Sequence, residues 1–162
     1  MKSARFAEIL RLLATSQVEF IVVGMTAGIL GGAPMTTLDI DIVHRRTPEN
    51  ADRLLHVLQE MGATYRHDAR NLTPTVAHLM SPGHQLLATT YGDLDCLGTI
   101  DAGKSYEDLL SSTQEIALTD GLLIRILDLP ALIEIKRRAA RPKDLAAIPV
   151  LEATLDERNR RG

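Results

Sequence analysis

The sequence predicts an α/β or α+β domain with a central mixed β-sheet flanked by helices. Three observations predict it. Short β-branched runs cluster in the middle of the chain, helical periodicity flanks them, and glycine or proline separates most of the segments. With 162 residues, of which 45% are hydrophobic, the chain suits a single domain spanning 1–162.

The first third of the chain alternates helices and strands. Apolar residues from Phe6 to Leu13 follow helical spacing, and a β-branched run that ends at Gly24 predicts a buried strand. Pro48 and Gly62 bracket a third segment of apolar residues at helical spacing. The expected elements are a helix near 6–13, a strand at 19–24, a short helix at 25–33, a strand at 39–43 and a helix at 48–61.

The remainder of the chain predicts more strands and then helices. The expected elements are a weak strand at 63–68, two strands at 84–91 and 93–100 around a glycine, a short helix at 105–110, a strand at 122–127, and helices at 129–140 and after 142. Pro149 is expected to kink or split the last helix, because proline lacks the N–H group that a helix uses. The tail at 156–162 is expected to be frayed and solvated.

Composition narrows the classes of function. The net charge of -3 gives no global attraction to nucleic acid or to an anionic membrane, and the scarcity of aromatic residues argues against base stacking. Cys96 is the single cysteine, which fits a reducing compartment. The first residues lack the apolar stretch of a signal peptide, and no apolar run approaches the roughly 20 residues that span a bilayer. We therefore expect a cytoplasmic protein with no membrane partner.

Two aspartates stand among isoleucines in the segment TTLDIDIVHRR. Side chains at i and i+2 on a strand share a face, so Asp39 and Asp41 take one face and Leu38, Ile40 and Ile42 the other. Paired carboxylates suit hard divalent cations, and two such ions about 3.5–4 Å apart can activate a nucleophile and neutralise a phosphate leaving group. The alternative interpretation is a polar strand edge that faces solvent.

The surroundings of this pair favour the metal interpretation. Upstream, Gly24 lies between a strand and a helix start, where backbone N–H groups bind phosphate, and Thr26 adds a hydroxyl. Downstream, Asp93 and Asp95 again share a strand face. We expect Asp95 to be the third carboxylate of the site and the group that takes a proton from an incoming hydroxyl, and Asp93 to belong to a turn.

The order of these motifs resembles the nucleotidyltransferase superfamily, the fold of DNA polymerase β and the aminoglycoside nucleotidyltransferases. The matching stretches are VVGMTAGILGGAPMTTLDIDIV and then GDLDCLG. The resemblance is closer to the bacterial AbiEii-type toxin nucleotidyltransferases and their uncharacterised relatives, in which a helix similar to LIEIKRRAARPKDLAAI follows the third aspartate. It covers about residues 18–152.

The resemblance implies a reaction and a set of residues. An NTP would donate NMP to an acceptor (RNA such as tRNA, a protein or a small molecule) with release of pyrophosphate, aided by two Mg²⁺ ions or by Mn²⁺. A toxin role with an antitoxin partner is implied as well. The implied metal ligands are Asp39, Asp41 and Asp95. The implied nucleotide-binding residues are Gly24, Met25, Thr26, Thr37 and Lys136, and Lys136 would join the three aspartates in catalysis.

The chain departs from the family pattern at two positions, and this keeps alternatives open. Met25 replaces a second small residue after the glycine, and Met35 stands where relatives often carry arginine. A member of the superfamily that binds a nucleotide or partner without catalysis is one alternative. A phosphatase of the haloacid-dehalogenase type, with Asp39 as nucleophile, is another. For Lys136, which continues a helical apolar stripe, the amine either points into the site or reaches water along the margin of the stripe.

Overall fold

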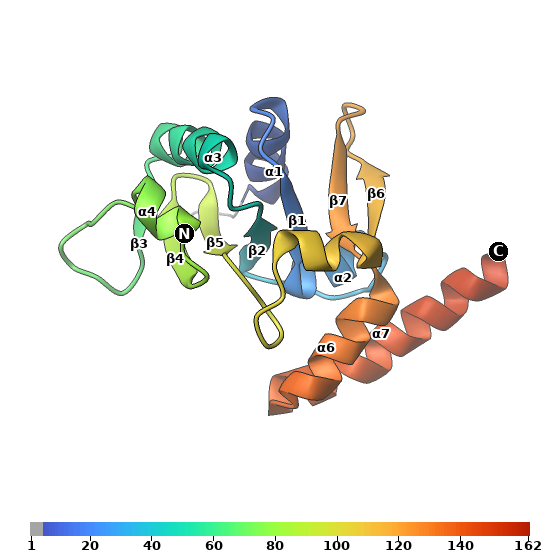
Figure 1. Ribbon diagram of the computed structural model, residues 1–162. Helices are drawn as coiled ribbons and strands as arrows, with labels where there is room; N and C mark the ends of the chain where they lie inside the picture. Colours follow the sequence, from blue (N-terminus) through green and yellow to red (C-terminus); the bar gives the residue numbers. More distant parts are fainter. Residues whose placement is uncertain (1–4) are drawn as a thin grey trace.

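The protein is described by a computed structural model over residues 5–162, in which one mixed sheet forms the centre (Figure 1). Its seven strands have the order β3-β4-β5-β2-β1-β7-β6. They are β1 (Phe20–Val23), β2 (Asp39–His44), β3 (Thr64–Tyr65), β4 (His84–Thr89), β5 (Gly92–Leu97), β6 (Thr113–Ala117) and β7 (Leu123–Leu127). Strand β1 is antiparallel to β2 and parallel to β7, and β2 is parallel to β5. The predicted mixed sheet flanked by helices is confirmed.

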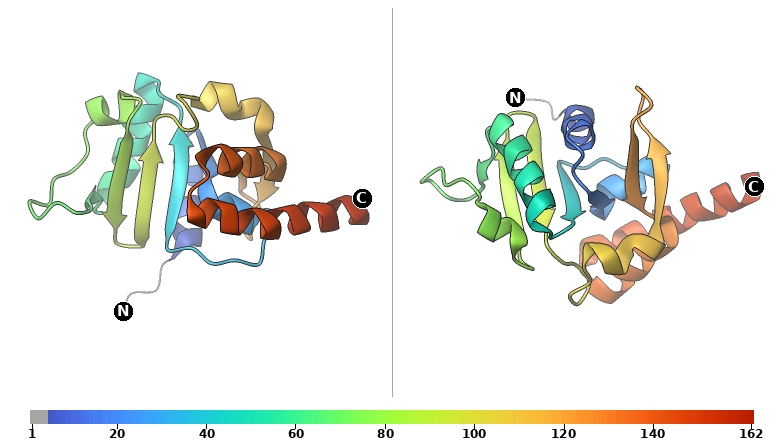
Figure 2. Two further views of the ribbon diagram at one scale, coloured as in Figure 1. Left: turned by 90° about the horizontal axis from the view of Figure 1, so that it is seen from below. Right: turned by 45° about the horizontal axis from the view of Figure 1, so that its top comes forward.

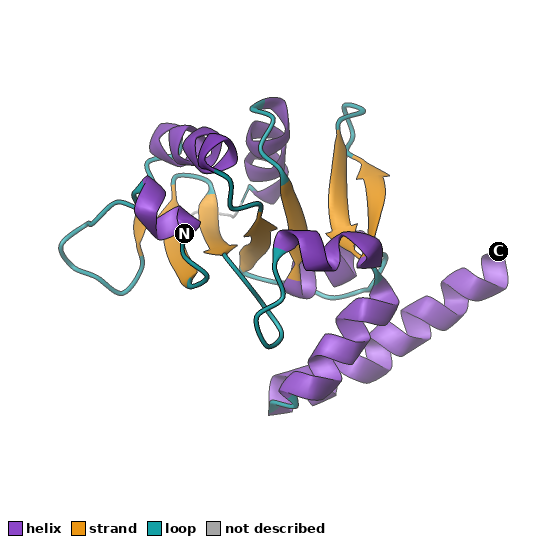
Figure 3. Ribbon diagram, in the orientation of Figure 1, coloured by secondary structure: helices purple, strands orange, loops and turns teal. Residues whose placement is uncertain are grey.

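Helices lie on both sides of this sheet (Figures 2 and 3). They are α1 (Phe6–Thr15), α2 (Gly24–Leu30), α3 (Pro48–Glu60), α4 (Val76–Met80), α5 (Tyr106–Leu109) with a 3-10 turn at Leu110–Ser112, α6 (Leu129–Ala139) and α7 (Pro142–Arg161). Helices α1 and α3 cover one face, and α6 and α7 form a helical hairpin on the other, whose last turns extend beyond the sheet (Figure 2).

Local signals set the helix boundaries. Thr47 caps α3 by accepting a hydrogen bond from the Asn50 N–H, and Pro48 follows at the first helical position. Asp128 caps α6 in the same way through the N–H of Ala131. The buried residues of β2, Ile40 and Ile42, have no exposed surface, so this strand is anchored through the face opposite its aspartates.

Two elements were not predicted. Helix α4 is a five-residue helix fixed by a capping box between Thr75 and His78, too short for helical periodicity to show. Strand β6 is an edge strand that pairs only with β7, and its mixed polar sequence lacks the alternation of a half-buried strand. The predicted weak strand at 63–68 shrinks to the two residues of β3.

Three further expectations were wrong. Leu38 does not join the buried face of β2: it precedes the strand and is 86% exposed. Pro149 does not split the last helix, because α7 runs unbroken to Arg161. The carbonyl that Pro149 leaves without a helical donor belongs to Leu145, a residue that is 52% exposed. The tail, expected to be frayed, is exposed but helical as far as Arg161.

Candidate active site

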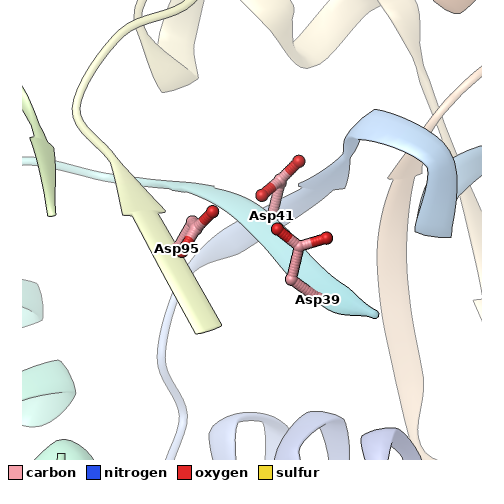
Figure 4. Close-up of side chains that lie close together, drawn as sticks. All are labelled: Asp39, Asp41 and Asp95. Atoms are coloured by element: carbon pink, nitrogen blue, oxygen red, sulfur yellow. The ribbon is translucent and has the colours of Figure 1, made fainter. Parts of the chain in front are cut away.

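Three aspartates meet on one face of the sheet (Figure 4). Strands β2 and β5 pair in parallel with Asp41 opposite Asp95, so the register brings Asp95 to the same face as Asp39 and Asp41. One ligand oxygen from each of the three lies within 4.8 Å of the others. Asp95 is the most enclosed, with 6% of its surface exposed. The expected convergence of these carboxylates is present in the structure.

A glycine allows Asp41 to lie against the start of α2. Gly24 begins this helix with φ of +64°, in the left-handed region that favours glycine. A Cβ atom on Gly24 would overlap Oδ2 of Asp41. The turn after β1 therefore needs glycine for two separate reasons, its backbone angle and its contact with the acidic cluster.

The environment of Asp41 disfavours its charge. Burial is the main cause, and a hydrogen bond with Asp95 and the negative charge of Asp39 add to it, so that the pKa of Asp41 rises to about 7. The positive charge of Lys136 acts in the opposite direction. A divalent cation at this point would remove the penalty by neutralising the three carboxylates.

The two threonines of the predicted nucleotide site play different parts. Thr37 lines the cavity described below, and its hydroxyl lies 3.3 Å from Oδ1 of Asp39. Thr26 is 5% exposed, and its hydroxyl donates to the carbonyl of Asp39 at 3.0 Å. The hydroxyl proton of Thr26 is therefore already used in a bond within the protein. That bond holds the start of β2 against α2.

A cavity of about 1130 Å³ opens over the three aspartates. The turn after β1, the ends of β4 and β5, and helices α6 and α7 all contribute to its walls. Met25 and Met35, the two departures from the family pattern, both line it. Besides the aspartates, its lining includes Gly24, Thr37, Leu86, Ile100, Lys136 and Arg141.

Lys136 lies in the wall of the cavity and is held there by a buried carboxylate. Its side chain is 11% exposed, and its Nζ lies 3.0 Å from Oδ1 of Asp144, a fully buried group on α7. Nε of Arg141 lies 2.6 Å from Oδ2, the other oxygen of Asp144. The Arg141 hydrogen bond is the main cause that lowers the pKa of Asp144 to about 2. Of the two interpretations of Lys136, the one that points its amine inward fits this geometry.

Sequence reasoning missed Arg66 and the buried role of Asp144. Arg66 follows β3, and its Nη1 lies 2.6 Å from Oδ1 of Asp95. No local pattern connects Arg66 with a residue 29 positions further on, so only the sheet order reveals the contact. Asp93, assigned to a turn, lies in β5 opposite Asp39 and on the same face as the other aspartates. The i, i+2 spacing of Asp93 and Asp95 was the sequence signal that could have placed Asp93 in the strand.

The donor set fits a hard divalent metal ion. Three carboxylates within reach of one another supply the oxygen ligands that Mg²⁺ and Mn²⁺ prefer, and no softer ligand joins them among the described residues. Cys96 points to the opposite face of β5 and is fully buried, which also leaves no catalytic role for its thiol.

The comparison with solved structures identifies the fold. The chain superposes on the lincosamide antibiotic adenylyltransferase LnuA with a TM-score of 0.64 and 16% identity, over 95% of this chain and 99% of that one. The chain has the nucleotidyltransferase fold. The antibiotic-resistance factor ANT(2'')-Ia matches with a TM-score of 0.61 and 18% identity, over 93% of this chain and 82% of that one. A Thermotoga maritima protein assigned to the nucleotidyltransferases, TM1012, matches with a TM-score of 0.58 and 17% identity, over 96% of this chain and 97% of that one.

The comparisons of the sequence with family models and with curated proteins add nothing to the fold assignment. No family model matches the sequence, and no curated protein matches it. LnuA was solved with lincomycin bound, and a second ANT(2'')-Ia structure holds adenylyl-2''-tobramycin. Among residues 5–162, no helix has the length and apolar character needed to cross a membrane.

Proposed function

We propose that the protein transfers NMP from an NTP to a hydroxyl acceptor in a Mg²⁺-dependent reaction that releases pyrophosphate. The observation that carries the proposal is the meeting of Asp39, Asp41 and Asp95 in a cavity that also contains the Gly24 turn and the amine of Lys136. Acidic ligands for a metal thus face a cationic group suited to a triphosphate, within one cavity on a nucleotidyltransferase fold.

Each residue has a role in this reaction. The acceptor oxygen forms a bond to the α-phosphorus of the NTP, the bond to pyrophosphate breaks, and Asp95 takes the proton of the acceptor hydroxyl. Asp39, Asp41 and Asp95 would hold the divalent ions, which would neutralise charge on the phosphates and activate the nucleophile. Lys136 stabilises negative charge on the phosphates, and the N–H groups of the turn at Gly24, Met25 and Thr26 are the proposed phosphate cradle. Thr37 fixes the orientation of Asp39.

The acceptor proposed is a small molecule that carries a hydroxyl group. Among the described residues no Phe, Tyr or Trp lines the cavity, and His84 supplies its one aromatic ring, so the bases of an RNA would find little stacking surface there. The basic segment 136–143 is also largely neutralised. Apart from Lys136, which is assigned to the NTP, Arg141 pairs with Asp144, Arg138 pairs with Asp101, and Arg137 pairs with Glu134. A tRNA acceptor would require these cations for its phosphates.

The test incubates the protein and Mg²⁺ with each of the four NTPs, labelled at the α-phosphate, and with three fractions of a lysate: small molecules, total RNA and proteins. The Asp39→Ala/Asp41→Ala variant is the control. Transfer of label to the small-molecule fraction by the native protein alone supports the proposal. Label that enters RNA instead would assign a tRNA-like acceptor, and label that enters protein would assign a protein hydroxyl.

The favoured alternative function is nucleotide binding without catalysis. Met25 and Met35 motivate it, because bulky thioethers line the cavity where the family pattern has a small residue and often an arginine. Calorimetry of each NTP with Mg²⁺ separates the possibilities. Binding that requires the aspartates but gives no transfer to any fraction would favour the alternative. The phosphatase alternative does not fit, because Asp39 begins β2 and does not follow a buried strand.

A toxin role with an antitoxin partner, implied by the AbiEii resemblance, remains a prediction. Expression of the native chain in a bacterial host should arrest growth, and expression of the Asp39→Ala/Asp41→Ala variant should not. Normal growth with the native chain at equal protein levels would exclude a toxin role in that host.

A further inference from the structure

A guanidinium group reaches the acidic cluster from outside the predicted motifs. Arg66 follows the short edge strand β3, and its backbone N–H donates to the carbonyl of Leu86 in β4. Its side chain then crosses β4, where Nη1 donates to the carbonyl of Leu87 at 2.7 Å and to Oδ1 of Asp95 at 2.6 Å. The side chain is 17% exposed. Arg66 is therefore held at both its backbone and its head group.

The contact meets a specific electrostatic need of Asp95. The Asp95 side chain is 8% exposed and lies beside Asp39 and Asp41. A buried carboxylate among like charges is costly unless a cation pairs with it. Among residues 5–162, Arg66 is the cation that forms a salt bridge with Asp95. The amine of Lys136, the other cation near the cluster, pairs with Asp144 instead.

The pairing with Arg66 engages Oδ1, one of the two oxygens of the Asp95 carboxylate. One carboxylate oxygen from each of Asp39, Asp41 and Asp95 lies within 4.8 Å of the others. Figure 4 shows an oxygen of Asp95 directed toward Asp41. Nε of Arg66 lies 3.7 Å from Asp93, so the guanidinium bridges two aspartates of β5.

We propose that Arg66 is a positioning residue for the reaction: it fixes the orientation of the Asp95 carboxylate and supplies its counter-charge. This inference rests on the proposed function, because it assigns Asp95 to the reacting centre. Arg66 acts through Asp95 and does not itself contact a reacting atom. The planar fork of arginine suits this role, because one nitrogen donates to both Leu87 and Asp95; a lysine amine keeps the charge but not the fixed geometry.

The first experiment measures turnover and metal binding of Arg66→Gln and Arg66→Lys. Arg70→Gln is the matched control, because Arg70 lies in the same connection and pairs with the neighbouring Asp68 on the surface. We expect Arg66→Gln to lower kcat by about 10–100-fold, the range for partners of metal ligands, with the KM for NTP little changed. Arg66→Lys should recover part of the loss, and Arg70→Gln should behave as wild type.

Metal binding without nucleotide distinguishes positioning from general damage to the site. Mn²⁺ titrations followed by electron paramagnetic resonance should show that Arg66→Gln binds the ion at least as tightly as wild type, because a nearby positive charge has been removed. A purely structural role would weaken metal binding and turnover together, and that result overturns the inference. Unchanged kcat in Arg66→Gln overturns it as well.

A double-mutant cycle tests the coupling without any need for activity. Arg66→Gln should lower the Tm by roughly 5 °C in the native background, because a buried carboxylate loses its partner, and by much less in the Asp95→Asn background. Equal losses in both backgrounds would contradict the coupling of Arg66 to Asp95. Absence of NMP transfer by the wild-type protein would refute the proposed function, whereas this cycle would still decide whether the two residues are coupled.

Discussion

Gly24 and Asp41 occupy adjoining space, and a methyl group on Gly24 would overlap Oδ2 of Asp41. Gly24 follows β1 as the first residue of α2, and Asp41 lies in β2, which pairs with β1 in antiparallel orientation. Val23, the last residue of β1, lies opposite Asp41. The register of β1 with β2 thus joins the turn at Gly24 to the acidic cluster. This contact makes the glycine a sensitive probe of the site.

Gly24→Ala should impair the site more than it impairs the fold. Alanine at φ of +64° is strained, and its Cβ would displace the Asp41 carboxylate. We expect a drop in NMP transfer and in Mn²⁺ affinity of at least tenfold each, with a loss of roughly 1–2 kcal/mol in the free energy of unfolding. Gly121→Ala is the control, because Gly121 also has a positive φ, has no atom within 4 Å of an added Cβ, and lies outside the cavity lining. Equal losses in the two variants would point to backbone strain alone.

Removal of the metal ligands should abolish activity. Asp39→Asn and Asp95→Asn each remove one anionic ligand, and the loss should exceed the 10–100-fold that partners of ligands typically cost. Transfer assays and Mn²⁺ titrations measure both effects. Transfer by Asp39→Asn at near wild-type rate would contradict the assignment of the triad.

The raised pKa of Asp41 predicts how the stability of the metal-free protein depends on pH. Its pKa is about 7 in the folded state and about 3.9 when unfolded, so the folded state binds more protons between these values. The contribution of Asp41 is fully present below about pH 4 and is lost as the pH rises through 7. Asp41→Asn should therefore match wild type near pH 4 and exceed its Tm at pH 8.

Added Mg²⁺ should reverse this difference. At pH 8 the ion binds the ionised triad and raises the Tm of the wild-type protein, because it binds the folded state selectively. It should have little effect on Asp41→Asn. A Tm of wild type that is insensitive to Mg²⁺ at pH 8 would count against a metal site at these aspartates.

Asp144→Asn should destabilise the α6–α7 hairpin. Asp144 is fully buried between Lys136 and Arg141, and loss of its charge leaves two cations without their partner. We expect a loss on the order of 3 kcal/mol, or a Tm lower by roughly 6–12 °C. Because its pKa is about 2, below the unfolded value, this stabilisation is present above about pH 4 and is lost as the pH falls toward 2. Asp68→Asn, which alters an exposed ion pair, is the control and should change the Tm little.

Lys136→Met should reduce kcat/KM for the NTP by about 10²–10³-fold, the typical cost of one group that stabilises developing charge. Lys143→Met tests specificity, since Lys143 also lines the cavity but has no carboxylate partner among the described residues. It should cost far less. Similar losses for both lysines would indicate a diffuse positive potential at the cavity.

The periodicity of the chain determined most of its elements. Side-chain alternation placed Asp39 and Asp41 on one face of β2, and the buried Ile40 and Ile42 confirm that face. The same alternation placed Asp93 and Asp95 together on one face of β5. Short or edge elements escaped prediction, because α4 and β6 depend on a cap and on a single neighbouring strand, neither of which produces a period in the sequence.

The sequence by itself determined which side chains share a strand face, which turn requires glycine, and which residue types make up the acidic set. Only the tertiary structure decided which strands are neighbours. The parallel pairing of β2 with β5 places Asp95 beside Asp41, and the position of β4 lets Arg66 reach Asp95. Strand order and register depend on packing between segments far apart in the chain, whereas periodicity reports only on residues a few positions apart.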